Sequence, residues 1–253
     1  MRAVAVLALF VLSGCGWEAM GLGARAHFER TVALEPTGTF RLENVNGKVK
    51  VEPWDRSDVR IEAEKSASSE DYLDEIQIEV QGEGDRVEVK TRFPRRHFFL
   101  GGHGQVEYTI HLPAQARVEL RTVNGGVEVD GMGAAVRANT VNGSVRITET
   151  AGAVDAGTVN GSIRVEYRRA ALEGEHRCST TNGSVTVYLP DAAGEVDVQT
   201  VNGSITTDFP LEVKGKIGGR RLEGRVGSGR ATFRIRTVNG SVKLLRSGGD
   251  KVV

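Results

Sequence analysis

Most of the chain alternates apolar and polar residues with a period of two, the pattern of β-strands that bury one face. The alternation is clearest in seven segments that align without gaps, each centred on an Asn-Gly pair. These pairs are Asn46-Gly47, Asn124-Gly125, Asn142-Gly143, Asn160-Gly161, Asn182-Gly183, Asn202-Gly203 and Asn239-Gly240. The pattern predicts one short strand on each side of every pair, so we expect an all-β protein.

Two architectures satisfy this repeat. Asn and Gly tolerate positive φ angles, so each pair would close a hairpin through a type I′ turn and give a row of stacked β-hairpins. Alternatively, each 18–22-residue unit is one coil of a parallel β-helix or β-solenoid, with Asn-Gly at a corner. We favour the solenoid, because stacked coils place equivalent residues about 4.8 Å apart and explain why whole columns repeat one residue type.

The repeat also predicts how the chain is divided. The interval before Asn239 is long enough for two units, and Leu222–Val226 resembles a decayed copy within it. Residues 27–115 alternate well but carry Asn-Gly only at 46–47, so we expect a less regular β region that caps one end, with a short helix near 68–73. The predicted parts are a signal peptide (1–14), a tether (15–26), this irregular region (27–115), the solenoid (116–246) and a tail (247–253).

The N-terminus carries an export signal. The unbroken apolar run Ala3–Leu12 would span about 15 Å as a helix, too short for about 30 Å of hydrocarbon, so it indicates a signal peptide. Leu12-Ser13-Gly14-Cys15 resembles the bacterial lipobox, which implies cleavage before Cys15 and lipidation of that residue. We therefore expect an exported protein that is anchored by lipid in the bacterial cell envelope, in the outer membrane if the cell is Gram-negative.

The array of Thr-Val-Asn-Gly-Ser-Val copies resembles the putative-adhesin family of bacterial envelope proteins, a β-strand-repeat domain of unknown function. The resemblance covers roughly residues 36–246. It implies a β-helix-like fold and an envelope location, and it supplies no catalytic residues.

The composition argues against several functions. Lys plus Arg and Asp plus Glu both number 33, and this balance argues against nucleic acid as a partner. The five histidines are scattered, and no carboxylate or cysteine joins the closest pair, His97 and His103, so we expect neither a metal site nor a cofactor. Cys178 has no partner once Cys15 is lipidated, and we interpret it as a small buried apolar residue.

Two features remain as candidate contact surfaces. The tip Phe98-Phe99-Leu100 is the best candidate for an exposed apolar contact loop. Several units also carry a base four residues after Asn and an acid six residues after it, and parity places both columns outward. The bases are Lys50, Arg146, Arg164 and Lys243, and the acids are Glu52, Asp130, Glu166 and Asp208. We interpret this as a solvated, charge-mixed face, whose basic column could meet an anionic glycan or lipid head group.

We therefore expect a non-enzymatic protein that is held at the membrane by its N-terminal lipid. Its rigid β-repeat surface would bind an unknown envelope protein or glycan, as an adhesin or a scaffold. An alternative is a component that senses envelope stress. A polysaccharide-active β-helix enzyme is the less favoured alternative, because it rests on fold analogy and the chain has few aromatic residues to stack on sugars.

Overall fold

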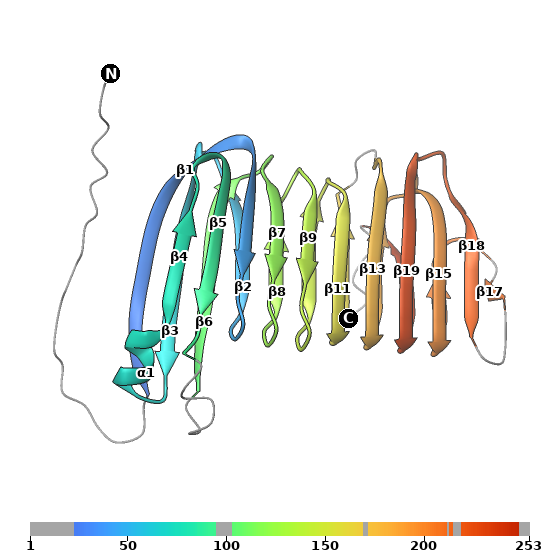
Figure 1. The fold of residues 1–253 in the computed structure, drawn as a ribbon. Coiled ribbons are helices and arrows are strands. Elements are labelled where there is room, and N and C mark those ends of the chain that lie inside the picture. The colour runs from blue at the N-terminus through green and yellow to red at the C-terminus, as the bar shows by residue number, and fades with distance from the viewer. Residues whose placement is uncertain (1–22, 95–102, 169–171, 212, 215–218, 248–253) are drawn as a thin grey trace.

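The computed structural model describes residues 23–94, 103–168, 172–211, 213–214 and 219–247. Two β-sheets face each other along an elongated molecule (Figure 1). The predicted all-β, solenoid-like architecture is confirmed, because neighbouring repeats pair in parallel and in register. In each regular coil a strand of one sheet leads through the Asn-Gly corner into a strand of the other sheet, and a return loop closes the opposite edge.

The strand order shows how the coils stack. The first sheet, sheet A, has this order: the N-terminal half of β1 (Ala24–Glu43), β3 (Asp58–Ala67), β6 (Gly104–Pro113), β2 (Val49–Trp54), β8 (Val127–Asp130), β10 (Val145–Thr150), β12 (Ile163–Tyr167), β14 (Val185–Leu189), β20 (Val242–Arg246) and β16 (Ile205–Thr207).

Sheet B lies opposite. Its order is β4 (Gln77–Gln81), β5 (Gly84–Arg92), the C-terminal half of β1, β7 (Arg117–Arg121), β9 (Val136–Asn139), β11 (Val154–Asn160), β13 (Glu175–Asn182), β19 (Ala231–Asn239), β15 (Gly194–Asn202), β18 (Arg220–Val226) and β17 (Val213–Lys214). The two strands that flank each corner belong to different sheets. The alternative of stacked hairpins, in which those strands would pair, is therefore wrong.

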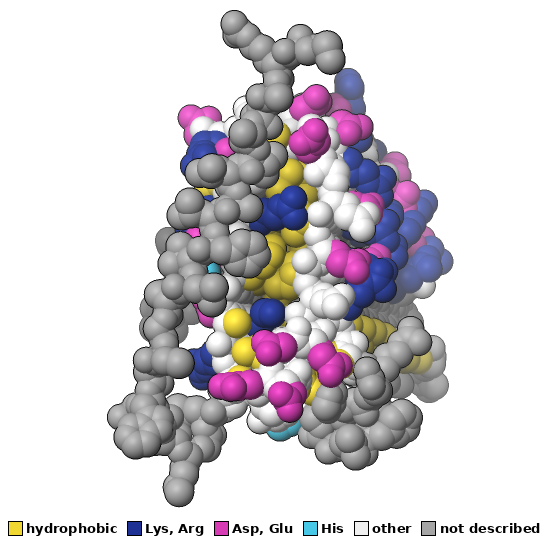
Figure 2. All heavy atoms as spheres, turned by 60° about the vertical axis from the view of Figure 1, so that its left-hand side comes forward, with side chains coloured by type: hydrophobic (Ala, Val, Ile, Leu, Met, Phe, Trp, Pro, Cys, Tyr) yellow, Lys and Arg dark blue, Asp and Glu magenta, His cyan; other side chains and the backbone are white. Residues whose placement is uncertain are grey.

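The N-terminal region extends both sheets. β3 pairs antiparallel with β1 and β6, and β4 pairs antiparallel with β5. The predicted short helix is α1 (Glu70–Glu75), whose N-terminus is capped by the Ser69 hydroxyl, which accepts the Tyr72 amide. At this end of the stack a band of hydrophobic side chains runs between the sheets (Figure 2). Phe28 and Val32 of β1 and Val80 of β4 are partly buried and pack against the core.

One boundary needs correction. The predicted tether, 15–26, extends too far, because Ala24 already begins β1 and pairs with Ala67. Residues 15–22 of that tether and the predicted signal peptide lie outside the described residues. The last three tether residues fold because β3 offers them a full antiparallel partner, which a local reading of the chain does not reveal.

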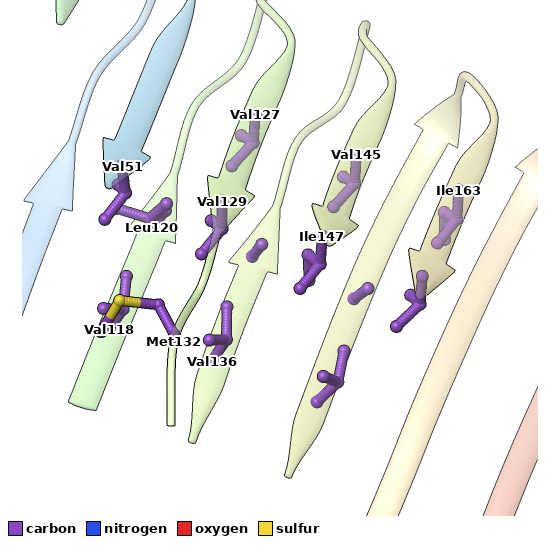
Figure 3. Close-up of a cluster of buried hydrophobic side chains, with 14 of the residues drawn as sticks. Val51, Val118, Leu120, Val127, Val129, Met132, Val136, Val145, Ile147 and Ile163 are labelled. Atoms are coloured by element: carbon purple, nitrogen blue, oxygen red, sulfur yellow. The ribbon is translucent and has the colours of Figure 1, made fainter. Parts of the chain in front are cut away.

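The core is a double row of aliphatic side chains between the sheets. Val127 and Val129 of one coil lie beside Val145 and Ile147 of the next, and Val118, Leu120 and Val136 face them from sheet B (Figure 3). All of these side chains are buried. Since the rows flanking each corner both point into this interior, no coil buries its apolar residues without its neighbours.

The last coil does not occupy the end of the stack. β19 pairs in parallel with β13 on one side and with β15 on the other, so it is inserted between two earlier coils. The segment Leu222–Val226, predicted to be a decayed coil, belongs instead to β18, which pairs antiparallel with β15 beyond it. That prediction assumed that coils stack in chain order. It is wrong because the antiparallel β18 returns the chain past β15 and leaves the place next to β13 for β19.

Candidate binding surface at the Asn-Gly corner

The seven corner asparagines form one continuous hydrogen-bonded ladder. In space their order is Asn46, Asn124, Asn142, Asn160, Asn182, Asn239 and Asn202. Each later side chain donates its Nδ2–H to the Oδ1 of the previous one at 2.8–2.9 Å. Asn46 ends the ladder by donating to the Gly104 carbonyl at 3.2 Å. The ladder ties all seven corners into one rigid edge.

The glycine after each asparagine is required for a reason different from the predicted one. Of the seven corner glycines only Gly47 (φ 118°) and Gly183 (φ 159°) have positive φ, and none of the asparagines does. The type I′ interpretation is therefore wrong. A Cβ on Gly143 would lie 2.1 Å from the Gly125 carbonyl oxygen, so close stacking of coils excludes any side chain.

In six of the seven coils a threonine lies two positions before the asparagine and fixes the corner from inside, and Asn44 takes this place in the first coil. These threonines are 2–7% exposed. The Thr140 and Thr158 hydroxyls each donate, at 2.9 Å, to the corner-glycine carbonyl of the neighbouring coil, Gly125 and Gly143 respectively. Because a buried hydroxyl without a partner is costly, this column favours a single register between coils.

The residue between threonine and asparagine forms the exposed rim of the corner. In six of the seven coils it is valine, with 37–49% of its surface exposed. We call this row the corner stripe: Val45, Val123, Val141, Val159, Val238 and Val201, with Thr181 in the position between Val159 and Val238. These six are the exposed large hydrophobic residues of the described chain. The stripe was not predicted from the sequence, although side chains alternate along a strand and these valines therefore point away from the face of the buried threonines.

The charged columns predicted on sheet A lie on its outer face, and two of the four bases pair within their own coils. Lys50 Nζ lies 2.8 Å from Glu52, and Arg164 lies 3.5 Å from Glu166. Arg164 also donates to the Tyr188 hydroxyl at 2.9 Å. The structure brings no two of the predicted acids into a cleft.

The buried side chains of Cys178 and His176 are uncharged at neutral pH. Burial raises the pKa of the Cys178 thiol to about 12, so the thiol stays protonated at neutral pH. Burial lowers the pKa of His176 to about 4, so the ring is neutral there. Within the described ranges, no three His, Cys, Asp or Glu side chains gather in a way that could hold a metal ion.

Two predicted site elements are not placed by the structure. Cys15 and the contact loop Phe98-Phe99-Leu100 lie outside the described residues. In the part of the chain that the structure covers, no helix is both long and apolar enough to cross a membrane.

The chain is similar to one protein family and to several solved structures. A family model described as Toastrack DUF4097 matches residues 37–245. A putative cell adhesion protein from Clostridium sporogenes is 15% identical, with a TM-score of 0.45 over 87% of this chain and 100% of that one. A putative adhesin from Bacteroides fragilis is 10% identical, with a TM-score of 0.31 over 87% and 97%. A putative lipid binding protein from Parabacteroides distasonis is 11% identical, with a TM-score of 0.26 over 88% and 98%. No curated protein sequence matches the chain.

Proposed function

The chain belongs to the Toastrack DUF4097 family, and from that premise we propose that it is a non-enzymatic, lipid-anchored envelope protein whose corner stripe binds a partner protein. The observation that carries this proposal is the row of six exposed valines on a rigid edge. Such an apolar row resembles the centre of a protein interface more than a sugar-binding surface.

The rigidity of the stripe favours binding. Five of the six valines lie between a buried threonine and an asparagine of the ladder, and Val45 lies between the buried Asn44 and Asn46, so the backbone is held on both sides. A partner that docks here therefore orders little additional chain, and less of the interaction free energy is lost as entropy.

The entry point of the described chain supports a position of the stripe near the proposed anchor. Ala24 pairs with Ala67, Ala67 pairs with Gly104, and the Gly104 carbonyl accepts the Asn46 side chain. The chain thus enters at the corner edge. The nine residues from Cys15 to Ala24 reach at most about 30 Å. A lipid on Cys15 would therefore keep the Asn46 end of the stripe close to the membrane surface, where another envelope protein is within reach.

The partner interaction is tested by Val141→Asp with Val159→Asp in the full, membrane-bound chain. Captured envelope proteins are cross-linked and quantified by mass spectrometry. We expect capture of the partner to fall about tenfold, because two carboxylates would be buried in an apolar contact. The matched control is Thr186→Asp with Thr206→Asp, which adds the same charge to the outer face of sheet A and should leave capture unchanged. Capture of no protein by the native chain, or equal capture by both variants, would refute the proposal.

The anchor is tested separately with Cys15→Ser. We expect this variant to leave the membrane fraction while its far-UV circular dichroism and melting temperature stay the same. If the variant still sediments with membranes, the lipid anchor is absent and the stripe must reach its partner by another route.

A further inference from the structure

The outer face of sheet B carries a row of side chains that the corner does not use. The row crosses five neighbouring strands in register, since Arg121 pairs with Asn139, Asn139 with Gly157, Gly157 with Ser179, and Ser179 with Arg236. We call these five residues the arginine trough. Its two ends are four strand spacings apart, about 19 Å.

The floor of the trough is low and polar. Gly157 has no side chain, and a Cβ built there would meet Asn139 Oδ1 at 2.4 Å and Ser179 Oγ at 3.9 Å. An amide and a hydroxyl therefore line the middle of the row, with the backbone of β11 between them. Both groups donate and accept hydrogen bonds, as the hydroxyls of a sugar do.

The two ends of the trough carry cations without an ion-pair partner. In the described chain neither Arg121 nor Arg236 forms a salt bridge or a side-chain hydrogen bond. Of the acids nearest to them, Glu43 lies 3.3 Å from Lys90 and Asp197 lies 3.2 Å from Arg221, while Glu119, two residues before Arg121, contacts neither arginine. Both guanidinium groups therefore remain available to an external anion.

A recess at the Arg236 end of the trough adds further positive charge to it. It has a volume of about 480 Å³ and is lined by Arg177, Cys178, Ser179, Arg234 and Arg236. Arg177 and Arg234 lie directly opposite each other on β13 and β19, and both bind the single carboxylate of Glu175. Like charges at opposed positions repel, and the one carboxylate of Glu175 offsets only part of the charge of these two arginines.

The excess of positive charge covers this part of sheet B. Outward positions of β7, β9, β11, β13 and β19 carry six arginines against three carboxylates. The arginines are Arg117, Arg121, Arg137, Arg177, Arg234 and Arg236, and the acids are Glu119, Asp155 and Glu175. Lys and Arg side chains gather along the right-hand side of Figure 2, where the outer face of sheet B comes into view.

We propose that the arginine trough binds an acidic polysaccharide, laid across the strands along the long axis of the molecule. Carboxylates of the polymer pair with the planar forks of Arg121 and Arg236, a geometry that arginine matches with two parallel hydrogen bonds. Sugar hydroxyls between them bond to Asn139 and Ser179. A ligand with one carboxylate is too short to use both ends of the trough. The trough has no exposed apolar or aromatic side chain, which disfavours a lipid tail or a stacked nucleobase. This site is separate from the corner stripe and does not depend on it.

The experiment is calorimetric titration of the full chain in detergent micelles with polygalacturonate oligomers, and with neutral dextran of similar length. We expect the acidic polymer to bind and dextran not to bind. Arg121→Gln with Arg236→Gln should weaken binding at least about tenfold. The matched control is Arg25→Gln with Arg230→Gln, which removes two exposed cations that form no ion pair within the described residues and lie outside both the trough and the basic column of sheet A. It should change the affinity less than about twofold.

A second variant tests the floor without changing charge. Gly157→Thr places a branched side chain in the middle of the trough, and it too should weaken binding about tenfold if the polymer lies there. Failure of the native chain to bind polygalacturonate would overturn the proposal. Equal losses in the two double variants, or competition by duplex DNA at equal charge concentration, would also overturn it, because either result means attraction without a site. The capture assay on the corner stripe is independent, so either proposal can fail alone.

Discussion

At the residue scale, His176 is the buried group whose protonation the structure opposes most directly. Its Nδ1 accepts hydrogen bonds from the Tyr167 hydroxyl at 2.8 Å and from the Val154 amide at 3.3 Å. The ring also stacks on Phe233, with centroids 4.6 Å apart. Burial lowers the pKa of His176 from 6.5 to about 4, against a smaller opposing effect of the Glu173 backbone. A proton on Nδ1 would face the donating Val154 amide, and burial penalises the charged ring, so the folded protein disfavours protonation.

This lowered pKa predicts a loss of stability in acid. The unfolded chain binds a proton at His176 near pH 6.5, and the folded chain does so only near pH 4. The contribution of His176 to the free energy of unfolding should therefore stay constant above about pH 7, fall as the pH drops through 6.5, and level off below 4, with a total loss of about 3 kcal/mol. Urea unfolding across this range measures the loss. His176→Gln removes the titrating group, and a pH profile parallel to that of the native chain would contradict the assignment.

At the element scale, each corner restricts which residue type the neighbouring coil can carry at the position after its asparagine. The Thr-Val-Asn-Gly pattern predicted where each corner lies, and the structure confirms seven corners in one column. The reason given for the glycine was wrong, because the requirement arises between coils and not within a turn. A single segment contains no information about how closely the next backbone approaches, so only the stacked structure could reveal it.

Gly143→Ala tests this contact. The new methyl group would lie 2.1 Å from the Gly125 carbonyl oxygen, and the coils must separate to admit it. We expect the free energy of unfolding to fall by about 1–3 kcal/mol in urea titration. Gly126→Ala is the matched control, since its nearest atom is the Ser144 carbonyl oxygen at 3.5 Å. That variant should stay within about 0.5 kcal/mol of the native chain, and equal effects in both variants would show that backbone stacking does not select the glycine.

At the scale of the whole molecule, the inserted last coil changes what a truncation does. In a solenoid stacked in chain order, removing residues 231–253 would only shorten one end. Here it removes β19 and β20, which separate β13 and β14 from β15 and β16.

We therefore expect hydrogen exchange of this truncated chain to show lost protection at the amides of β15 and β16 that bond to β19 and β20, although β18 still pairs with the other edge of β15. β8 to β12 should keep their protection, because their nearest neighbours are retained. The retained coils serve as the internal control. Continued protection of the β15 amides that bond to β19 would mean that β15 can pair directly with β13 and that the interleaved order is not required.

The sequence by itself determined the all-β class, the position of every corner, and which side of each strand is buried. These properties follow from residue type at fixed local spacing, and each coil carries them independently. The tertiary structure alone decided which coils are neighbours. It placed Arg234 of the last coil against Arg177, joined Ser179 to Arg236 in one trough, and brought each corner glycine against the carbonyl of the next. Those contacts join residues far apart in the chain, and they arise because unpaired strand edges bind whichever partner completes their hydrogen bonds, not whichever comes next in sequence.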